Sequence, residues 1–271
     1  MEAAETRARE SAGPAPRGAV RSELARTLLG FSALPLQALD FAVRRGALRQ
    51  ELTALLETPA EIDAEPDLRA ITQRRLRVFV SAAEASGEIH ASNTVSEMRA
   101  AVAALGAAPP AFAGLGGKRL AAGGVDMLGD PVQRATMGFD GVVTALPYYL
   151  DLLETCATHF RDVRPHVALL VDSPALHVPL ARIARRYGVR VVHFVTPQHW
   201  AWAPWRTANY ARSVDRALTI LPFEPAWFRR RGVEVAHVGH PLVDELASVP
   251  ATRAAPSCRT IALLPGSRRR V

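Results

Sequence analysis

The fold of this chain is decided by the stretch VVHFVTPQHWAW, residues 191–202. Four of its first five residues are Val or Phe, which is typical of a buried strand, and the strand ends before Pro197. Open α/β sheets keep their ligand sites in loops at the carboxyl ends of strands, where this His, Gln and Trp cluster follows. Trp200 and Trp202 fit two roles, a surface that grips a sugar ring or acyl chain, and a buried anchor for the loop.

Similar apolar runs recur along the chain and alternate with stretches of helical periodicity. Strands are expected over residues 76–80, 111–114, 167–171, 189–195, 217–220 and 235–238. Helices are expected over residues 92–105, 146–162, 177–187, 205–213 and 225–231. The repeated β-α-β units with short connections predict a Rossmann-like, doubly wound parallel sheet covered on both faces.

The N-terminal part does not share this alternation. Residues 1–20 have no hydrophobic periodicity and are predicted to be disordered, whereas residues 21–75 form a helical extension and a linker. Pro35 divides the extension into two helices. The extension is either an extra helical hairpin or a membrane-surface element, and we favour the hairpin because surface binding usually requires a stronger basic face.

The α/β domain is expected to occupy residues 76–258. Another strand is expected over residues 260–264, followed by a glycine turn, and such a pair should open a new β-α unit. Residues 259–271 are therefore interpreted as the start of a truncated second domain, and the chain as a fragment.

Composition excludes several classes of protein. The formal net charge is +7, and nearly all of the basic residues are Arg. No nucleic-acid-binding motif accompanies this charge, so the expected partner is an anionic membrane leaflet or a phosphorylated substrate, and not a nucleic acid. Cys156 and Cys258 have no CxxC spacing, which argues against a zinc site or a disulfide scaffold. No 18-residue apolar run and no signal peptide is found, so a cytoplasmic location is expected.

Two loops after strands carry polar groups suited to ligand binding or catalysis. In AEASGEIH, residues 83–90, small residues let a ligand approach the backbone, while Glu84, Ser86 and His90 can bind a sugar. A tight turn with a capping Ser is the alternative, and the absence of GxGxxG disfavours a dinucleotide. Asp172 follows another strand, where a carboxylate serves either as a general base or as the cap of the next helix.

Three more loops follow strands. Phe223-Glu224-Pro225 and Gly239-His240-Pro241-Leu242 lie at strand ends, although a lone His or Glu is usually structural and any parallel sheet gathers its loops at one edge. LPGSR, residues 264–268, combines a glycine turn with an Arg whose fork suits a diphosphate.

Taken in order, these segments resemble the lipid-A-disaccharide synthases, glycosyltransferases of bacterial outer-membrane lipid assembly. Each segment is weak alone, but the ordered set is specific and extends from about residue 76 to the end. The matching segments are AEASGE (83–88), GLGGKRL (114–120), MG (137–138), DSP (172–174), HFVTP (193–197), WAW (200–202), LPFE (221–224), VGHPL (238–242) and LPGSR (264–268).

The resemblance implies a GT-B fold, of which this chain carries the N-terminal, acceptor-side domain. It implies transfer from UDP-2,3-diacylglucosamine to 2,3-diacylglucosamine 1-phosphate, with inversion, release of UDP, and neither a metal nor a cofactor. Asp172 matches the catalytic base, and Ser267 and Arg268 match the motif near the nucleotide phosphates. The acceptor-side positions are Glu84, Ser86, Gly87, Gly116, Gly117, Met137, Pro197, Trp200, Trp202, Glu224 and His240.

The sequence departs from the family pattern at three of these loops. The family's Gly-Glu-Ala-Ser-Gly-Asp is AEASGE at residues 83–88, its Asp-Ala-Pro-Asp-Phe-Asn is DSPALH at residues 172–177, and its Ser-Pro-Ser-Val-Trp is TPQHW at residues 196–200. The resemblance further implies peripheral association with the cytoplasmic face of the inner membrane and a possible homodimer. The fragment alone is expected to be inactive. The alternative is a truncated or degenerate, non-catalytic paralogue that binds lipid or a partner.

Overall fold

The computed structural model describes residues 14–57, 75–133, 139–247, 261 and 263. The strands are β1 (Arg77–Ala82), β2 (Ala111–Leu115), β3 (Asp126–Gly129), β4 (Val167–Val171), β5 (Arg190–Phe194), β6 (Arg216–Thr219) and β7 (Val235–His237). The longer helices are α2 (Pro16–Ser32), α3 (Leu34–Leu56), α4 (Ala85–Ala104), α6 (Phe139–Asp162) and α7 (Pro174–Arg186). The shorter ones are α5 (Lys118–Ala122), α8 (His199–Trp202), η2 (Pro204–Arg206), α9 (Thr207–Ala211), α10 (Glu224–Arg229) and α11 (Pro241–Ala247).

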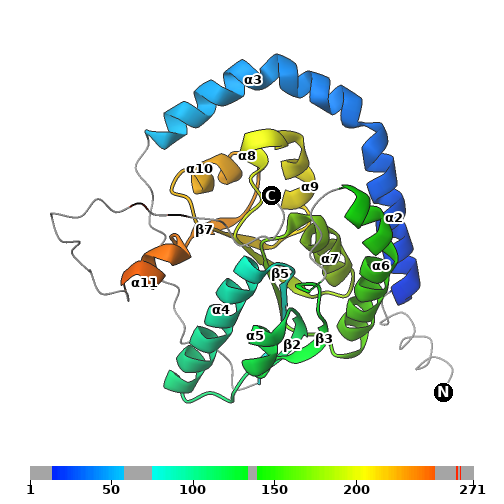
Figure 1. The fold of residues 1–271 in the computed structure, drawn as a ribbon, viewed down its shortest axis with the longest axis vertical. Helices are drawn as coiled ribbons and strands as arrows, with labels where there is room; N and C mark the ends of the chain where they lie inside the picture. The colour runs from blue at the N-terminus through cyan, green and yellow to red at the C-terminus, as the bar shows by residue number, and fades with distance from the viewer. Residues whose placement is uncertain (1–13, 58–74, 134–138, 248–260, 262, 264–271) are drawn as a thin grey trace, which may run out of the picture. The chain divides into compact units, whose positions relative to one another are not determined.

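The strands form one parallel sheet in the order β3-β2-β1-β4-β5-β6-β7 (Figure 1). The chain moves outward from β1 to β3 and then returns to lay β4 on the other side of β1, so the strand order reverses between β1 and β4. This topological switch point is where open α/β sheets bind ligands. Next to β1, Gly114 of β2 lies opposite Val80, and a Cβ at Gly114 would stand 1.7 Å from the Val80 carbonyl oxygen.

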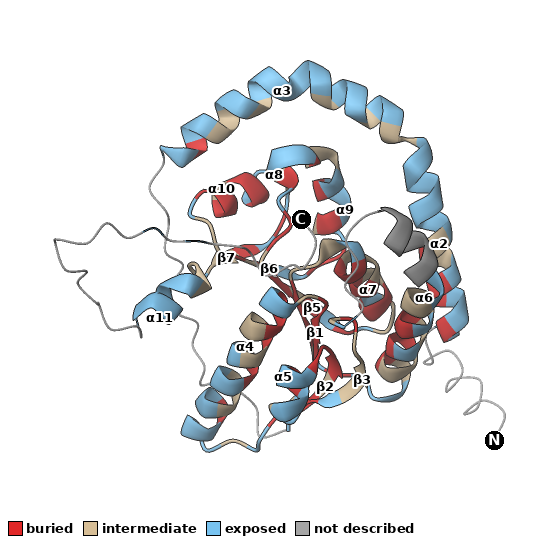
Figure 2. Ribbon diagram, viewed as in Figure 1, coloured by how far each residue is buried: buried red, intermediate tan, exposed pale blue. Residues whose placement is uncertain are grey.

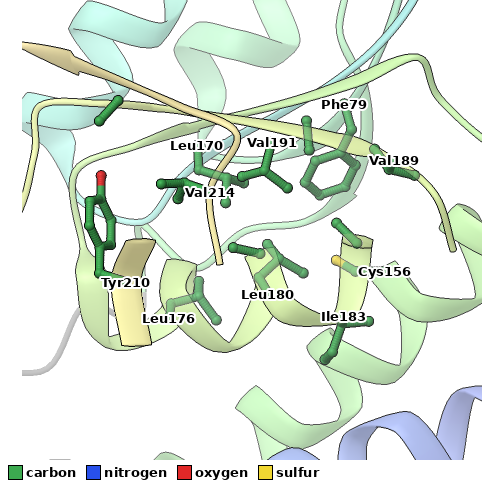
Figure 3. Close-up of a cluster of buried hydrophobic side chains, with 14 of the residues drawn as sticks. Phe79, Cys156, Leu170, Leu176, Leu180, Ile183, Val189, Val191, Tyr210 and Val214 are labelled. Atoms are coloured by element: carbon green, nitrogen blue, oxygen red, sulfur yellow. The ribbon is translucent and has the colours of Figure 1, made fainter. Parts of the chain in front are cut away.

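Apolar side chains pack on both faces of the sheet, as the sequence predicted. On one face, Phe79, Leu170 and Val191 of the strands pack against α6 and α7, which contribute Cys156 and Ile183 (Figure 3). Burial raises the pKa of the Cys156 thiol far above its ordinary value. The other face packs against α4 and α5 through a second buried cluster. The predicted Rossmann-like, doubly wound fold is therefore confirmed.

One missed strand and two helix starts are the main differences from the sequence predictions. β3 was not predicted, because its four residues carry one charge and a terminal Gly and resemble a turn. α4 begins at Ala85, and not near residue 92, because the Ser-Gly pair that looked like a loop lies in its first turn. α6 begins at Phe139, and not near residue 146, and continues through Pro147.

The N-terminal extension forms two long helices. α2 begins at Pro16, within the stretch that was predicted to be disordered up to residue 20, whereas residues 1–13 lie outside the described residues. The chain breaks at Ala33, and Pro35 occupies the first turn of α3, as predicted. The predicted hairpin is wrong, because α2 and α3 do not fold back on each other but follow one another along an arc (Figure 1).

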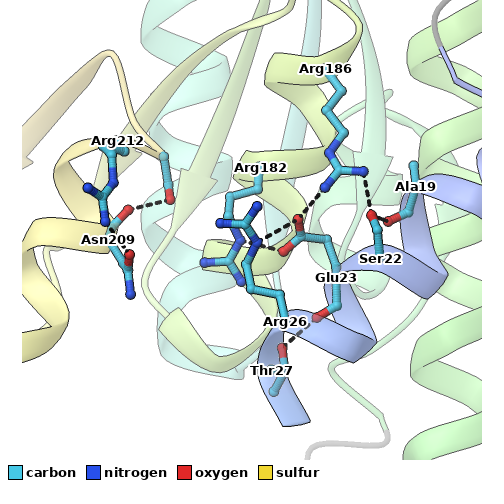
Figure 4. Close-up of polar contacts among 10 residues, drawn as sticks. Ala19, Ser22, Glu23, Arg26, Thr27, Arg182, Arg186, Asn209 and Arg212 are labelled. Atoms are coloured by element: carbon cyan, nitrogen blue, oxygen red, sulfur yellow. Dashed lines mark hydrogen bonds and ion pairs between the residues drawn. The ribbon is translucent and has the colours of Figure 1, made fainter. Parts of the chain in front are cut away.

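Both ends of this arc are fastened to the α/β domain. In α2 the buried Glu23 carboxylate forms ion pairs with Arg182 and Arg186 of α7, the latter at 2.9 Å (Figure 4). Near the end of α3, Leu55 is buried in the core and Glu51 pairs with Arg231 at 2.9 Å. Between these ends most side chains of α2 and α3 are exposed (Figure 2).

Residues 1–239 and residues 240–271 form two separate units. In the second unit the structure describes one helix, α11. His240, the residue before this helix, accepts a hydrogen bond from the Leu242 N–H at 3.2 Å. The strand expected over residues 260–264 falls mostly outside the described residues, and the two described positions, Ile261 and Leu263, are exposed and not in a strand. None of the helices that the structure describes is long and apolar enough to cross a membrane.

Candidate active site at the topological switch point

Asp172 lies directly after β4, beside the point where the strand order reverses. Asp172 and Ser173 have consecutive left-handed φ values of 57° and 45°, after which α7 begins at Pro174. A residue other than glycine in this region costs on the order of 1 kcal/mol or more, so its surroundings must impose the conformation.

The backbone of Asp172 is fixed by three hydrogen bonds. Its N–H donates to the Phe194 carbonyl at 2.8 Å, which extends the pairing between β4 and β5 by one residue. Its carbonyl oxygen accepts from the Nδ1 of His177 and from the Nε2 of His193, the latter at 2.9 Å. Because a carbonyl can only accept, both of these ring nitrogens carry a proton.

The remaining nitrogens of the two imidazoles are also satisfied. The Ser81 hydroxyl donates to the Nε2 of His177 at 2.8 Å, and the Tyr210 hydroxyl donates to the Nδ1 of His193 at 3.0 Å. Burial, followed by the neighbouring His193, lowers the pKa of His177 to about 3, and burial likewise lowers the pKa of His193. Both rings are therefore neutral near neutral pH, and together they hold the turn at Asp172.

The Asp172 side chain does not take part in this network. The predicted alternative, that Asp172 caps the next helix, is wrong, because Ser173 is the N-cap of α7 and that cap carries no side-chain hydrogen bond. Within the described part of the chain no hydrogen bond or ion pair reaches the Asp172 carboxylate. Its Cβ lies near Gly87 of α4, where an added Cβ would meet it at 3.7 Å. The carboxylate is thus a half-buried acceptor with no structural partner.

Two unsatisfied polar atoms belong to residues that follow β1 and β4. Among the described residues, the hydroxyl of Ser173 and the Nδ1 of His90 are buried without a hydrogen-bond partner. The His90 ring lies 6.1 Å from the ring of Phe194, whose carbonyl binds Asp172. Buried polar groups are normally paired, so unpaired ones at a strand edge indicate the place of a bound water or ligand.

Glu88, which follows the predicted Glu84-Ser86-Gly87 loop, has a structural role. Its buried Oε1 accepts hydrogen bonds from the backbone N–H groups of Gly117, Arg119 and Leu120 at 2.8, 2.9 and 3.0 Å. These groups form the N-terminal turn of α5, so the carboxylate caps that helix from α4. A Cβ at Gly117 would stand 2.9 Å from this carboxylate, which explains the glycine.

The predicted acceptor positions after β1 and β2 differ in exposure. Gly116 and Gly117 are buried, Glu84 is half-buried and Ser86 is exposed. Burial, followed by the charge of Glu84, raises the pKa of Tyr149 of α6. Tyr149 was not predicted, because a Tyr on a helix carries no sequence signal of a site.

The two Trp side chains of residues 200–202 behave differently. Trp200 is half-buried, packs against Phe223 with ring centroids 5.0 Å apart, and donates its Nε1–H to Glu224 at 3.1 Å. Trp202 is 50 % exposed, with the Arg206 guanidinium 5.1 Å from its ring. The first Trp therefore anchors the loop, and the second presents an aromatic surface.

Glu224 connects the loop after β5 to the loop after β6. Its second carboxylate oxygen accepts from the Leu221 and Ile220 N–H groups at 3.1 and 3.3 Å. Burial raises the pKa of Glu224, and these donors, with Trp200, partly oppose the rise. Pro197 is buried, and Val195 before it has a left-handed φ of 61°, so this loop is also held in a strained shape.

Of the remaining predicted positions, His240 lies in the second unit, and Met137, Ser267 and Arg268 lie outside the described residues. His177, His193 and Tyr210 were not predicted as functional. Only their burial and contacts identify them, because residues 193 and 210 are distant in sequence from residue 172 and no motif marks residue 177. In the parts of the chain that the structure describes, no group of three or more His, Cys, Asp or Glu could hold a metal ion.

The parallel sheet, its helices on both faces and the polar loops at the switch point define a Rossmann-like α/β protein with a candidate ligand site. A model of the lipid-A-disaccharide synthetase family matches residues 78–270. The chain therefore belongs to this family, which confirms the resemblance seen in its motifs.

Curated relatives agree with this assignment. The chain is 39 % identical over 199 residues to a lipid-A-disaccharide synthase of Myxococcus xanthus, 36 % over 204 residues to one of Geobacter metallireducens, and 34 % over 203 residues to lipid-A-disaccharide synthase 1 of Legionella pneumophila. Each match covers 71 % of this chain and 51 % of the relative. The chain thus spans about half the length of the curated relatives it matches.

Proposed function

We propose that this chain supplies the acceptor-side half of a lipid-A-disaccharide synthase. The reaction joins UDP-2,3-diacylglucosamine to 2,3-diacylglucosamine 1-phosphate through a β-1,6 bond and releases UDP. The family membership supports this role, and the relatives are named as synthases, which does not favour a non-catalytic, lipid-binding paralogue.

In this reaction Asp172 acts as the general base. As O6 of the acceptor attacks the anomeric carbon of the donor, the O6–H proton passes to the Asp172 carboxylate. The bond between the anomeric carbon and the diphosphate breaks, and its electron pair leaves with UDP. Positioned general bases of this kind contribute about 10²–10⁴-fold to a rate.

One observation carries the assignment of Asp172. Its carboxylate is held at the switch point by a rigid backbone, yet among the described residues nothing binds the carboxylate itself. A fixed but unpaired acceptor is suited to take a proton from a substrate hydroxyl. The exposed Trp202 and the half-buried Glu84 are proposed to contact the acceptor sugar, and Ser267 and Arg268 the nucleotide phosphates.

The test separates binding from chemistry. Acceptor binding is measured by Trp fluorescence in the 271-residue chain. Disaccharide formation is measured in the gene product at its natural length. Both measurements compare the wild type with Asp172→Asn and with the exposed control Asp151→Asn. We expect Asp172→Asn to lower kcat by about 10²-fold or more with little change in acceptor affinity, and Asp151→Asn to change neither. Wild-type kcat in Asp172→Asn would disprove the base role.

The proposed substrates determine the proposed location. Both carry acyl chains that reside in a membrane leaflet, so we place the protein at the cytoplasmic face of the inner membrane as a peripheral protein. A homodimer is compatible with this function and is tested by light scattering.

A further inference from the structure

His90 is a polar side chain near the switch point that the proposed mechanism does not use. It lies in the second turn of α4, two residues beyond the AEASGE segment, and its ring centroid is 6.1 Å from that of Phe194. Its Nδ1 is buried, and among the described residues this atom has no hydrogen-bond partner. Packing on Phe194, and not hydrogen bonding, therefore holds the imidazole in place.

His90 lies close to Asp172. A Cβ added at Gly87, one turn before His90, would stand 3.7 Å from the Cβ of Asp172. Residues three apart on a helix have Cβ atoms about 5–6 Å apart, so the Cβ atoms of His90 and Asp172 are within about 10 Å of each other. Phe194, on which the His90 ring packs, accepts the backbone N–H of Asp172 at 2.8 Å. A single sugar ring is thus large enough to contact both side chains.

The unpaired Nδ1 determines what the His90 ring can offer a ligand. In a neutral imidazole one nitrogen carries the proton and the other accepts. A buried N–H without a partner is rarer than a buried acceptor without one, so we assign the proton to Nε2. Nε2 is not among the buried unpaired atoms, and within the described residues no hydrogen bond occupies it. In a protonated ring both nitrogens donate, so Nε2 is a donor in either charge state.

The proposed acceptor has one hydroxyl that the reaction leaves free. In 2,3-diacylglucosamine 1-phosphate the acyl groups occupy N2 and O3 and the phosphate occupies O1, so O4 and O6 are the free hydroxyls. O6 forms the new bond, and O4 is carried by the ring carbon next to the one that bears C6. A hydrogen-bond donor beside the general base is therefore suited to bind O4 while O6 reacts.

We propose that the Nε2–H of His90 donates a hydrogen bond to O4 of the acceptor, while Asp172 receives the proton of O6. The inference rests on the proposed function, from which it takes its substrate. His90 is then a specificity-determining residue, because a site that binds O4 keeps this hydroxyl away from the base and directs O6 to it. The alternative is an imidazole that only packs on Phe194, and His90→Phe would then cost nothing.

The test combines two acceptors with variants of His90. Disaccharide formation is measured as kcat/KM in the gene product at its natural length, with the acceptor and with its 4-deoxy analogue. The wild type should use the acceptor about tenfold better than the analogue, as expected for one hydrogen bond to a substrate hydroxyl. His90→Phe keeps a ring to pack on Phe194 but removes the donor. It should lower kcat/KM about tenfold for the acceptor and change it little for the analogue.

Two further variants narrow the interpretation. His90→Gln places an amide N–H near the position of Nε2 and should retain most of the preference for the acceptor. Ser96→Ala, at an exposed position of the same helix, is the matched control and should behave like the wild type. Melting temperatures show whether each variant is folded.

Two outcomes would overturn the inference. In one, the wild type uses both acceptors equally well, a comparison that needs no variant. In the other, His90→Phe keeps the wild-type preference, or loses activity equally with both acceptors, which would assign the ring a structural role. A wild type that forms no disaccharide from either acceptor contradicts the proposed function, whereas an active wild type without the preference contradicts only the bond to O4.

Discussion

Three carboxylates lie near the carboxyl edge of the sheet, and they differ in what they bind. Glu88 accepts three backbone N–H groups, and Glu224 accepts two backbone N–H groups and the Trp200 indole. Asp172 has a comparably fixed backbone, but no described residue binds its carboxylate. The first two carboxylates join one loop to the next, whereas the third remains available.

This difference shows how to separate structural from functional acids at the edge of a parallel sheet. Every β-α loop ends there, so position alone does not distinguish them. Hydrogen-bond saturation does, because removing a carboxylate that accepts several backbone donors leaves those donors unpaired, whereas a carboxylate without partners leaves none. Four predictions test this contrast through the free energy of unfolding, from the largest effect to the smallest.

Glu88→Ala should have the largest effect. The substitution leaves the three N–H groups at the start of α5 without their acceptor, and we expect a loss of about 3 kcal/mol in the free energy of unfolding. Urea denaturation measures the loss. Glu97→Ala, on the exposed face of the same helix, is the matched control and should cost less than about 0.5 kcal/mol. Equal losses in the two variants would contradict a capping role for Glu88.

Trp200→Ala and Trp202→Ala should differ although the residues are two positions apart. Trp200 packs on Phe223 and donates to Glu224, so its removal should cost about 2 kcal/mol. Trp202 is half exposed, and its removal should cost less than about 0.5 kcal/mol while weakening acceptor binding. Thermal melts and fluorescence titrations provide the two readouts. A larger stability loss for Trp202→Ala would reverse the assignment of anchor and surface.

His177 should make stability depend on pH. Its pKa in the folded state, about 3, lies below its ordinary value of 6.5, so between these values the unfolded chain binds the additional proton. Stability is therefore full above pH 6.5 and falls as the pH is lowered toward 3. His177→Asn retains a donor for the Asp172 carbonyl and should reduce this decline by about 1 kcal/mol per pH unit. Urea denaturation at several pH values measures the slope, and a comparison above pH 7 serves as the control. Parallel slopes would show that His177 is protonated in the fold.

Asp172→Asn should have the smallest effect on stability. Its backbone bonds are retained, and its side chain has no described partner to lose, so the free energy of unfolding should change by about 0.5 kcal/mol or less. The same variant is expected to lose activity, and this combination marks a functional acid. A loss comparable to that of Glu88→Ala would place Asp172 among the structural carboxylates.

The sequence predicted the sheet well, because its signals are local. The apolar runs that became β1, β4 and β5, and the break at Pro35, depend only on neighbouring residues. β3 was missed because a four-residue edge strand with an Asp cannot be recognised without the partner that pairs with it.

The candidate site was only partly predictable. The motifs placed Asp172 at a strand end, but they could not show that two imidazoles bind its carbonyl, because those contacts depend on how β5 and α7 pack. Glu88 and Glu224 also looked alike as acids after strands. Only their donors show that they are structural, and the distant ones, the Gly117 N–H for Glu88 and the Trp200 indole for Glu224, depend on how the loops pack.

The two imidazoles also determine how the site responds to an incoming sugar. Both ring N–H groups occupy the Asp172 carbonyl oxygen, so rotating the peptide group between residues 172 and 173 would leave two donors buried and unpaired. The turn is therefore preorganised before any ligand arrives. Acceptor binding therefore does not have to order this turn, and the carboxylate is already in a fixed position when the reacting sugars bind.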